Sequence, residues 1–159
     1  MKLHDVLLAG LFGLSTAASG QTLSPDGYGK IGFGQQLGAV ERQLGQRASP
    51  RPADPACSMV AFKRYPDVRF MVENGVITRA DASRIVRNSA GITARMSVKE
   101  AQRHRPALQV GPHKYDENGQ YLTLAQGKDK ALIFEASKGK LQRMRAGLKP
   151  AVEYVETCG

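Results

Sequence analysis

The polar run His113-Lys114-Tyr115-Asp116, followed by Tyr121 across a turn, holds the residue types best suited to chemistry. A histidine, a tyrosine and a carboxylate can carry out acid–base catalysis when they converge on a substrate. On a strand, however, His113 and Tyr115 would point to one face, and Lys114 and Asp116 to the other. We therefore expect His113 to be structural or a surface contact. Tyr115 and Tyr121 are better binding residues, because tyrosine combines a large contact area with a polar tip.

Two arginines, Arg79 and Arg143, lie at matching positions of two similar stretches, FMVENGVITRA at 70–80 and FEASKGKLQRM at 134–144. Such arginines could both recognise carboxylate, sulfate or phosphate groups through bidentate contacts. The alternative is a structural ion pair, for example with Glu73 or Glu135, which a repeated unit would retain. We favour the structural ion pair and keep both arginines as candidate binding residues.

Arg145 belongs to the densest basic cluster of the chain, which also holds Lys138, Lys140, Arg143 and Lys149. Such a cluster is either a patch for an acidic partner or a solvated hairpin. The candidate binding residues are therefore Arg79, His113, Tyr115, Tyr121, Arg143 and Arg145.

The two cysteines, Cys57 and Cys158, change meaning with the compartment. In an oxidising compartment, an even pair in a small domain is most simply a disulfide. This bond would close a loop of about 100 residues, worth up to about 4–5 kcal/mol in the chain-entropy model. It would also tie the C-terminal tail to the first half of the chain. A catalytic cysteine needs a nearby histidine, and neither cysteine has one in the sequence, so we predict the disulfide.

No metal-ligand cluster or known catalytic signature can be written from two cysteines and three histidines, so we expect no metal or cofactor. The segment GYGKIGFG at 27–34 is similar to a glycine-rich phosphate loop, but it lacks a preceding parallel strand and a Gly-Lys-Ser/Thr ending. Gly-x-Ser-x-Gly and His-Glu-x-x-His do not occur. We therefore predict a protein that is not an enzyme. The remaining catalytic alternative is a small periplasmic hydrolase that uses His113 with Asp116 or Cys158.

The chain has 159 residues, which suits one domain or two small halves that share a core. Its composition of 42% hydrophobic and 23% charged residues is ordinary for a globular protein, while 17 glycines and 8 prolines favour α+β or β over a helical bundle. The net charge of +9 suits anionic partners.

Residues 1–20 have the layout of a secretory signal peptide, with Lys2 near the start, an apolar run from Val6 to Leu14, and small residues ending at Ser19-Gly20. The apolar run is too short to span a bilayer as a stable helix. We therefore predict cleavage near Ser19-Gly20 and a periplasmic or secreted protein. Outside the cytosol, a basic protein meets few nucleic acids, so its partners would be proteins or anionic envelope components.

Two pairs of segments look alike in the same order along the chain. Residues 27–45 match 89–106, with Leu37 on Val98 and Val40 on Ala101, and residues 70–80 match 134–144. This order predicts a tandem duplication, with a first unit at 21–88 and a second unit at 89–159 that includes the C-terminal tail.

Each unit is predicted to be a short helix followed by antiparallel strands. Ser97 and Glu100 form a capping box for a helix in the second unit, and Leu37, Val40 and Leu44 have helical spacing in the first. Strands are expected at 57–62, 108–110, 121–124, 131–136 and 140–146, with a hairpin at 68–81 that turns at 74–75. The predicted fold is α+β, with one curved sheet, or two abutting sheets, and both helices on one face.

This arrangement resembles the tandem-repeat β-lactamase-inhibitor proteins. It is also similar to the small lipoprotein of the outer-membrane β-barrel assembly machinery, which carries one such unit. The resemblance spans most of the chain after residue 20 and rests on short patterns. The family's inhibitors tend to have a disulfide within each unit, whereas this chain has one cysteine per half. The residues that carry it are Gly32, Gly34, Leu37, Val40, Leu44, Gly45, Ser97, Glu100 and Ala101.

A closer likeness is to uncharacterised exported bacterial proteins with the run PHKYD, here 112–116, and a C-terminal Glu-x-Cys, here 156–158. The first resemblance implies protein binding by a concave sheet face without catalysis. We therefore expect an exported, monomeric binding protein, either an inhibitor of a protein partner or an envelope accessory. A glycan or anionic-polymer binder is the alternative, although the chain has no tryptophan and few aromatic residues to stack on sugars.

Overall fold

The computed structural model describes residues 21–158, and the predicted signal peptide at 1–20 lies outside them. Along the chain the elements are β1 (Thr22–Ser24), β2 (Gly27–Tyr28), β3 (Ile31–Gly32), α1 (Leu37–Leu44), β4 (Ser58–Ala61), β5 (Val68–Glu73), β6 (Val76–Ser83), β7 (Arg87–Asn88), α2 (Val98–His104), β8 (Gln109–Pro112), β9 (Gly119–Gln126), β10 (Lys130–Ser137), β11 (Lys140–Leu148) and the 3-10 helix η1 (Ala151–Glu153). Within residues 21–158, no helix has the length and apolar character needed to cross a membrane.

Seven strands form one antiparallel sheet in the order β4-β5-β6-β11-β10-β9-β8. Neighbours in this sheet are also consecutive strands of the chain, except at the centre, where β6 pairs with β11 and Asp81 lies opposite Arg145. A second, small sheet has the order β3-β2-β1-β7, and its β1–β7 pair is parallel. The α+β prediction is therefore confirmed.

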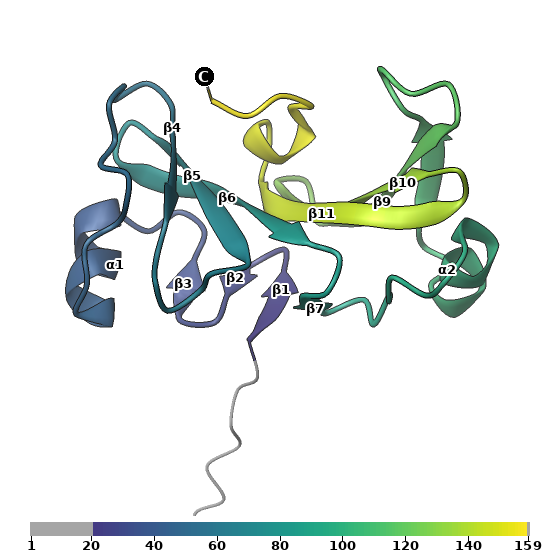
Figure 1. Cartoon of the computed structure of the whole chain (residues 1–159), viewed down its shortest axis with the longest axis horizontal. Helices are drawn as coiled ribbons and strands as arrows, with labels where there is room; N and C mark the ends of the chain where they lie inside the picture. Colours follow the sequence, from purple (N-terminus) through teal and green to yellow (C-terminus); the bar gives the residue numbers. More distant parts are fainter. Residues whose placement is uncertain (1–20, 159) are drawn as a thin grey trace, which may run out of the picture.

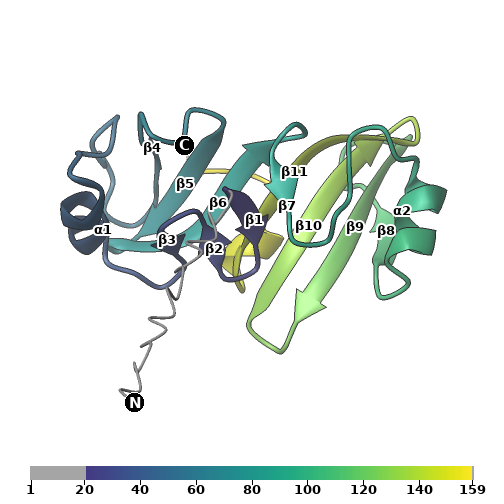
Figure 2. The ribbon, with the colours of Figure 1, turned by 90° about the horizontal axis from the view of Figure 1, so that it is seen from below.

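The long sheet divides the molecule into two sides. Figure 1 shows α1 and α2 at its two ends and the small sheet below it, while η1 and the C-terminal tail lie above. The view from below in Figure 2 shows the small sheet in front of the long one. The main core fills the lower side, where Leu23, Val40, Phe70, Ala101 and Phe134 are buried in one cluster. The upper side has only small apolar clusters, so its remaining positions can hold polar side chains.

The hairpins β5–β6 and β10–β11 share two local features. Each turns through two residues with positive φ, Asn74-Gly75 in the first and Lys138-Gly139 in the second. Such a pair is typical of the two-residue turns that match strand twist. Each hairpin also has a register shift just before its turn, after Met71 and after Glu135. The hairpin predicted at 68–81, with its turn at 74–75, is confirmed.

The two helices differ in their side-chain caps, but the residue before each helix makes a similar bridge to the long sheet. Ser97 and Glu100 form the predicted capping box, in which each side chain accepts from the other residue's backbone N–H. Gln36 precedes α1 without a side-chain cap. Gln36 makes an isolated bridge to Val76, the first residue of β6, and Ser97 makes one to Lys140, the first residue of β11. Each bridge thus reaches the second strand of a hairpin. These bridges fix each helix against a hairpin of the long sheet.

The run at 113–116 is not a strand, so the strand alternation considered for these residues does not apply. β8 ends at Pro112, and Asp116 accepts hydrogen bonds from the backbone N–H groups of Asn118 and Gly119. This turn brings His113 and Asp116 to the same side of the chain, whereas a strand would have separated them.

Candidate functional site

Polar side chains from four neighbouring strands meet on the upper side of the long sheet. Alternation along β10 buries Phe134 in the main core and directs Glu135 to the upper side. On β6 and β11, the same alternation places Ala80 and Ala146 in the core. The charged residues next to them in the sequence are therefore directed to the upper side of the sheet. The upper side thus carries Arg79 and Asp81 from β6, Arg143 and Arg145 from β11, Glu135 from β10 and Tyr121 from β9. Five of the six candidate binding residues therefore converge, with His113 joining from the loop after β8.

Arg79 holds the C-terminal tail and has no surface to offer a partner, since only 1% of it is exposed. Its guanidinium donates to both carboxylate oxygens of Asp81, at 2.9 and 2.5 Å. Its Nη1 donates to the backbone carbonyls of Ala151 at 3.2 Å, Tyr154 at 2.7 Å and Glu156 at 3.5 Å. The structural interpretation of Arg79 is correct, but its partner is Asp81 and not Glu73 or Glu135.

Arg145 is also buried beneath the tail. Its Nε donates to the carbonyl of Val152 at 2.7 Å, its Nη1 donates to Glu135, and its guanidinium carbon lies 5.3 Å from the ring centre of Tyr121. With these contacts and 3% exposure, Arg145 is part of the support of the site. Arg145 therefore cannot be a contact residue for a partner in this structure.

Glu135 is the buried anion of the site. Its carboxylate accepts from Arg143 and Arg145, and its Oε2 lies 3.6 Å from Nε2 of His113. Burial alone would raise the pKa of Glu135, but the hydrogen bond from Arg143 and the charges of both arginines outweigh it and lower the pKa. The carboxylate therefore stays ionised and holds the two guanidinium groups in place. The predicted pair between Glu135 and Arg143 is confirmed.

His113 is packed between polar groups and has one nitrogen engaged. Its ring stacks on Tyr121 with a centroid distance of 4.4 Å, and its Nδ1 accepts from the N–H of Tyr115 at 3.1 Å. The neutral imidazole must then carry its proton on Nε2, which faces Glu135. The Tyr121 hydroxyl oxygen is buried without a hydrogen-bond partner within residues 21–158. Tyr121 is thus half-buried and contacts both His113 and Arg145.

Tyr115 lies in the loop after β8 and is 63% exposed. Its hydroxyl donates to Glu156 of the tail, which also accepts from Lys114 at 3.2 Å. The hydrogen bond from Tyr115, the backbone N–H of Glu156 and the hydrogen bond from Lys114 lower the pKa of Glu156 to about 2. The loop and the tail therefore lock together beside the site.

A hollow of about 350 Å³ opens next to these groups, and Arg143 forms one of its walls. Among hydrogen bonds within residues 21–158, Arg143 uses only its Nε, toward Glu135. Its side chain is 66% exposed, so the two Nη groups are free to bind an anion from outside. His113, Asp116 and Ser137 line the same hollow, and Ser137 donates its hydroxyl to Asp116 at 2.6 Å.

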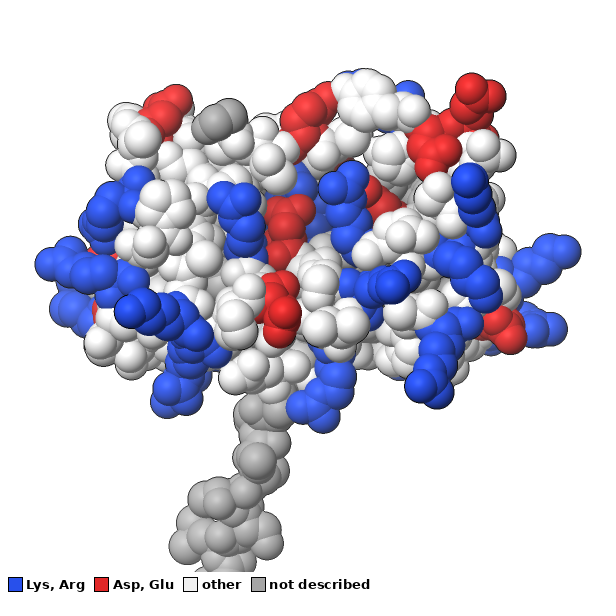
Figure 3. All heavy atoms as spheres, viewed as in Figure 1, with Lys and Arg blue, Asp and Glu red and all other residues white. Residues whose placement is uncertain are grey.

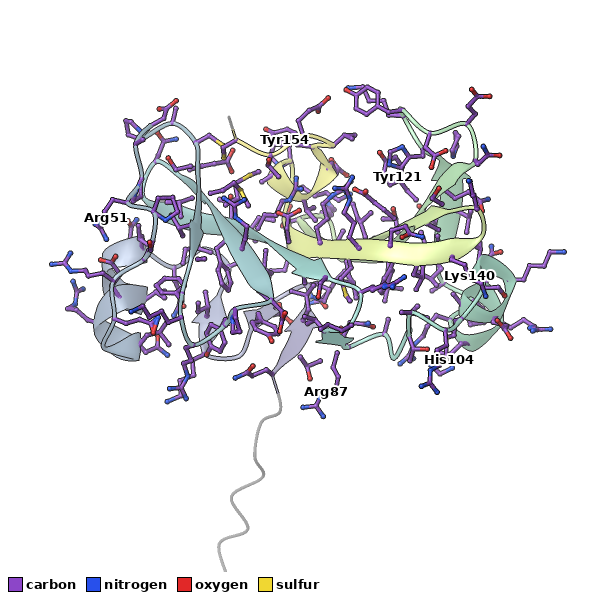
Figure 4. The ribbon with its side chains drawn as sticks, in the orientation of Figure 1. Arg51, Arg87, His104, Tyr121, Lys140 and Tyr154 are labelled. Atoms are coloured by element: carbon purple, nitrogen blue, oxygen red, sulfur yellow. A yellow bond between two sulfur atoms is a disulfide. The ribbon has the colours of Figure 1, made fainter. Side chains whose placement is uncertain are left out.

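The predicted disulfide joins the C-terminal tail to the residue that precedes β4. Cys57 and Cys158 are bonded, with 5.4 Å between their Cα atoms, and the sulfurs pack against Met59, Met71 and Ala151. Figure 4 shows Tyr154 of the tail and Tyr121 of β9 on the same upper side. Because Cys158 is in this bond, the hydrolase alternative that uses its thiol is excluded in the oxidised protein. No group of three or more metal-ligating side chains occurs in the described chain.

Asp81, Glu156 and the tail carbonyls are site residues that the sequence did not reveal. Asp81 could have been found, because Arg79 and Asp81 are two positions apart and so share one face of a strand. Nothing in the sequence places the tail over β6, since the tail is more than 70 residues away along the chain.

Comparison with models of protein families, with curated proteins and with solved structures finds no match to the chain.

Proposed function

We propose that the chain is an exported, non-enzymatic protein that binds an acidic group of a protein partner at Arg143. The observation that carries this proposal is the free outer edge of the Arg143 guanidinium, which faces a hollow of about 350 Å³. The two other arginines of the site, Arg79 and Arg145, are used within the protein. Among the three arginines of the site, Arg143 is therefore the one whose guanidinium can still bind an anion.

The neighbours of Arg143 support a binding role because they reduce its freedom before a partner arrives. Glu135 accepts from Nε and so orients the Nη groups outward. Tyr115 is exposed but anchored through its hydroxyl to Glu156, which leaves the ring as a contact surface. Side chains that are already ordered lose less entropy on binding, which favours affinity.

We further propose that the long sheet joins two copies of one helix-and-meander unit, with both helices on one face. The shared turns, register shifts and helix bridges of the two halves support this proposal. So does the central pairing, in which Asp81 and Arg145 occupy matching positions of the two units and lie opposite each other. Arg79 and Arg143 would then be copies of one ancestral residue, of which the tail now covers only the first.

Export is proposed from two observations. Residues 1–20 have the pattern of a secretory signal peptide, and the Cys57–Cys158 bond needs an oxidising compartment to persist. An acidic surface of an envelope protein would be within reach of such a protein.

The test is an affinity pull-down from envelope extract, at about 0.1 M and about 1 M salt. It compares the mature protein with Arg143→Gln and with Arg103→Gln, which removes an exposed charge of α2 as a matched control. We expect one protein to be recovered at both salt concentrations, and recovery to fall about ten-fold with Arg143→Gln only. Recovery of polymer or of many acidic proteins, lost at high salt and equally with both variants, would instead support the anionic-polymer alternative.

Acid–base catalysis is a second candidate, since His113 and Asp116 line the same hollow beside the Ser137 hydroxyl. It is tested with chromogenic ester, amide and phosphodiester substrates. A turnover that His113→Ala abolishes would replace the binding proposal. A turnover that survives this change would remove the histidine mechanism.

A further inference from the structure

Cationic side chains gather at the end of the molecule opposite the tail. None of the ion pairs within residues 21–158 includes any of them. All are exposed, and they come from the turn between β2 and β3, the loop between β4 and β5, and the segment at 84–87 that ends in β7. The residues of this surface, named here the basic end, are Lys30, Lys63, Arg64, Arg84 and Arg87.

Hydrogen bonds show that these three segments are neighbours. The Tyr65 hydroxyl, in the loop between β4 and β5, accepts from the backbone N–H of Lys30 at 3.1 Å. The Asp67 carbonyl of the same loop accepts from the N–H of Ser83, where β6 ends and the segment with Arg84 begins. Figure 3 shows Lys and Arg side chains projecting along the lower edge of the molecule. The three segments that carry the five cations are therefore adjacent, and Asp67 is the carboxylate of the loop between β4 and β5.

An exposed apolar side chain lies in the segment that carries Arg84 and Arg87. Ile85, between Arg84 and the buried Val86, is 72% exposed, the highest value among the large hydrophobic side chains of residues 21–158. A shallow hollow of about 280 Å³ beside it is lined by Gln21, Tyr28, Asp67, Ile85, Val86 and Arg87. A single exposed isoleucine is common, but Ile85 is flanked along the chain by Arg84 and Arg87, neither of which is in an ion pair within residues 21–158, and so combines the two elements of membrane attachment.

We propose that the basic end binds the surface of an anionic lipid bilayer. The cations would lie among the lipid head groups, where each contributes attraction to a negative surface, and Ile85 would enter the boundary with the acyl chains. A soluble polyanion would satisfy the cations but would leave Ile85 in water. The combination of charges with an exposed apolar side chain therefore favours a bilayer over a polymer.

This attachment would orient the molecule. Arg87 lies below the long sheet in Figure 4, whereas Tyr121 and Tyr154 lie above it. A molecule seated on its basic end would direct Arg143 and the tail away from the bilayer. The inference is independent of the proposed function, because the two surfaces share no residue.

The chain has no tryptophan, so Ile85→Trp provides a unique fluorescent probe at this position. The mature variant is mixed with vesicles of phosphatidylcholine alone, with vesicles containing about one third phosphatidylglycerol, or with soluble polyphosphate. We expect a blue shift of tryptophan emission, and quenching by brominated acyl chains, only with the anionic vesicles. Binding of the unmodified chain is measured in parallel by co-sedimentation.

In co-sedimentation, we expect Arg84→Gln and Arg87→Gln each to lower the partition coefficient about five-fold. Arg69→Gln, which removes an exposed charge from β5 on the upper side, is the matched control and should change it less than about two-fold. Equal losses in all three variants, or an unshifted emission with anionic vesicles, would overturn the proposal. Binding to polyphosphate without acyl-chain quenching would identify the basic end as a polymer site.

Discussion

Arg79→Leu should destabilise the protein much more than Arg143→Gln, although the two arginines occupy matching positions of similar hairpins. The first change removes the guanidinium that contacts both oxygens of Asp81 and three carbonyls of the tail. Loss of one partner from a buried ion pair costs about 3–5 kcal/mol, because the other charge stays behind in a poor environment. Asp81 is 26% exposed and can regain some water, so we expect about 3 kcal/mol.

Arg143→Gln should cost less than about 1 kcal/mol, because 66% of this side chain is already in water and Glu135 keeps its bond to Arg145. The assay is urea unfolding at neutral pH with the disulfide intact, and with amide hydrogen exchange of residues 154–157 as a second readout. Exchange of the tail should accelerate in Arg79→Leu and stay unchanged in Arg143→Gln.

A double variant separates two contributions to the loss of stability. One is the cost of leaving Asp81 without its partner, and the other is the loss of the contacts between Arg79 and the tail. Arg79→Leu/Asp81→Leu removes both charges, so it should recover part of the stability lost in Arg79→Leu. If Arg79→Leu and Arg143→Gln instead shift the free energy of unfolding by similar amounts, the claim that Arg79 clamps the tail is wrong.

Three further predictions concern the tail and the centre of the sheet. Cys57→Ser/Cys158→Ser should lower the free energy of unfolding by up to about 4–5 kcal/mol in the chain-entropy model, since the bond joins residues 101 apart; urea midpoints with and without the bond measure this loss. Because the folded protein lowers the pKa of Glu156 from 4.5 to about 2, its contribution to stability is complete above pH 4.5 and is lost as the pH falls toward 2; urea midpoints of Glu156→Gln should lack this part of the pH dependence. Gly147→Ala should cost about 1–3 kcal/mol, because its Cβ would lie 2.3 Å from a backbone oxygen of β6, whereas Gly111→Ala meets no atom within 4 Å and should be nearly neutral in thermal unfolding.

Local signals account for the elements that the sequence predicted well. The helix that begins after Ser97 was predictable because its capping box involves residues three apart. The turn at Asn74-Gly75 was predictable because few residue pairs adopt positive φ at both positions. The conformation of the loop after Pro112 was not predicted, because the expected strands ended at residue 110 and resumed at residue 121. There the side chain of Asp116 closes a turn with Asn118 instead of extending the chain.

The sequence predicted which residues belong to the site, but it did not predict most of the contacts between them. Alternation on predicted strands was enough to bring Arg143 and Glu135 to one face, and this pair was among the alternatives. The stacking of His113 on Tyr121 depended on the loop geometry and was not predicted. The contact of Tyr115 with Glu156 joins residues 41 apart, and no local pattern indicates it.

The sequence alone determined the α+β class, the disulfide partners and the positions of the two similar hairpins, because these depend on composition, cysteine number and interactions between near neighbours. It could not distinguish Arg79 from Arg143, which have the same place in the same local pattern. Only the tertiary structure decided their roles, because the path of the tail across β6 buries the first arginine and leaves the second in water. That path depends on contacts between residues 72 to 77 apart, which a local pattern does not encode.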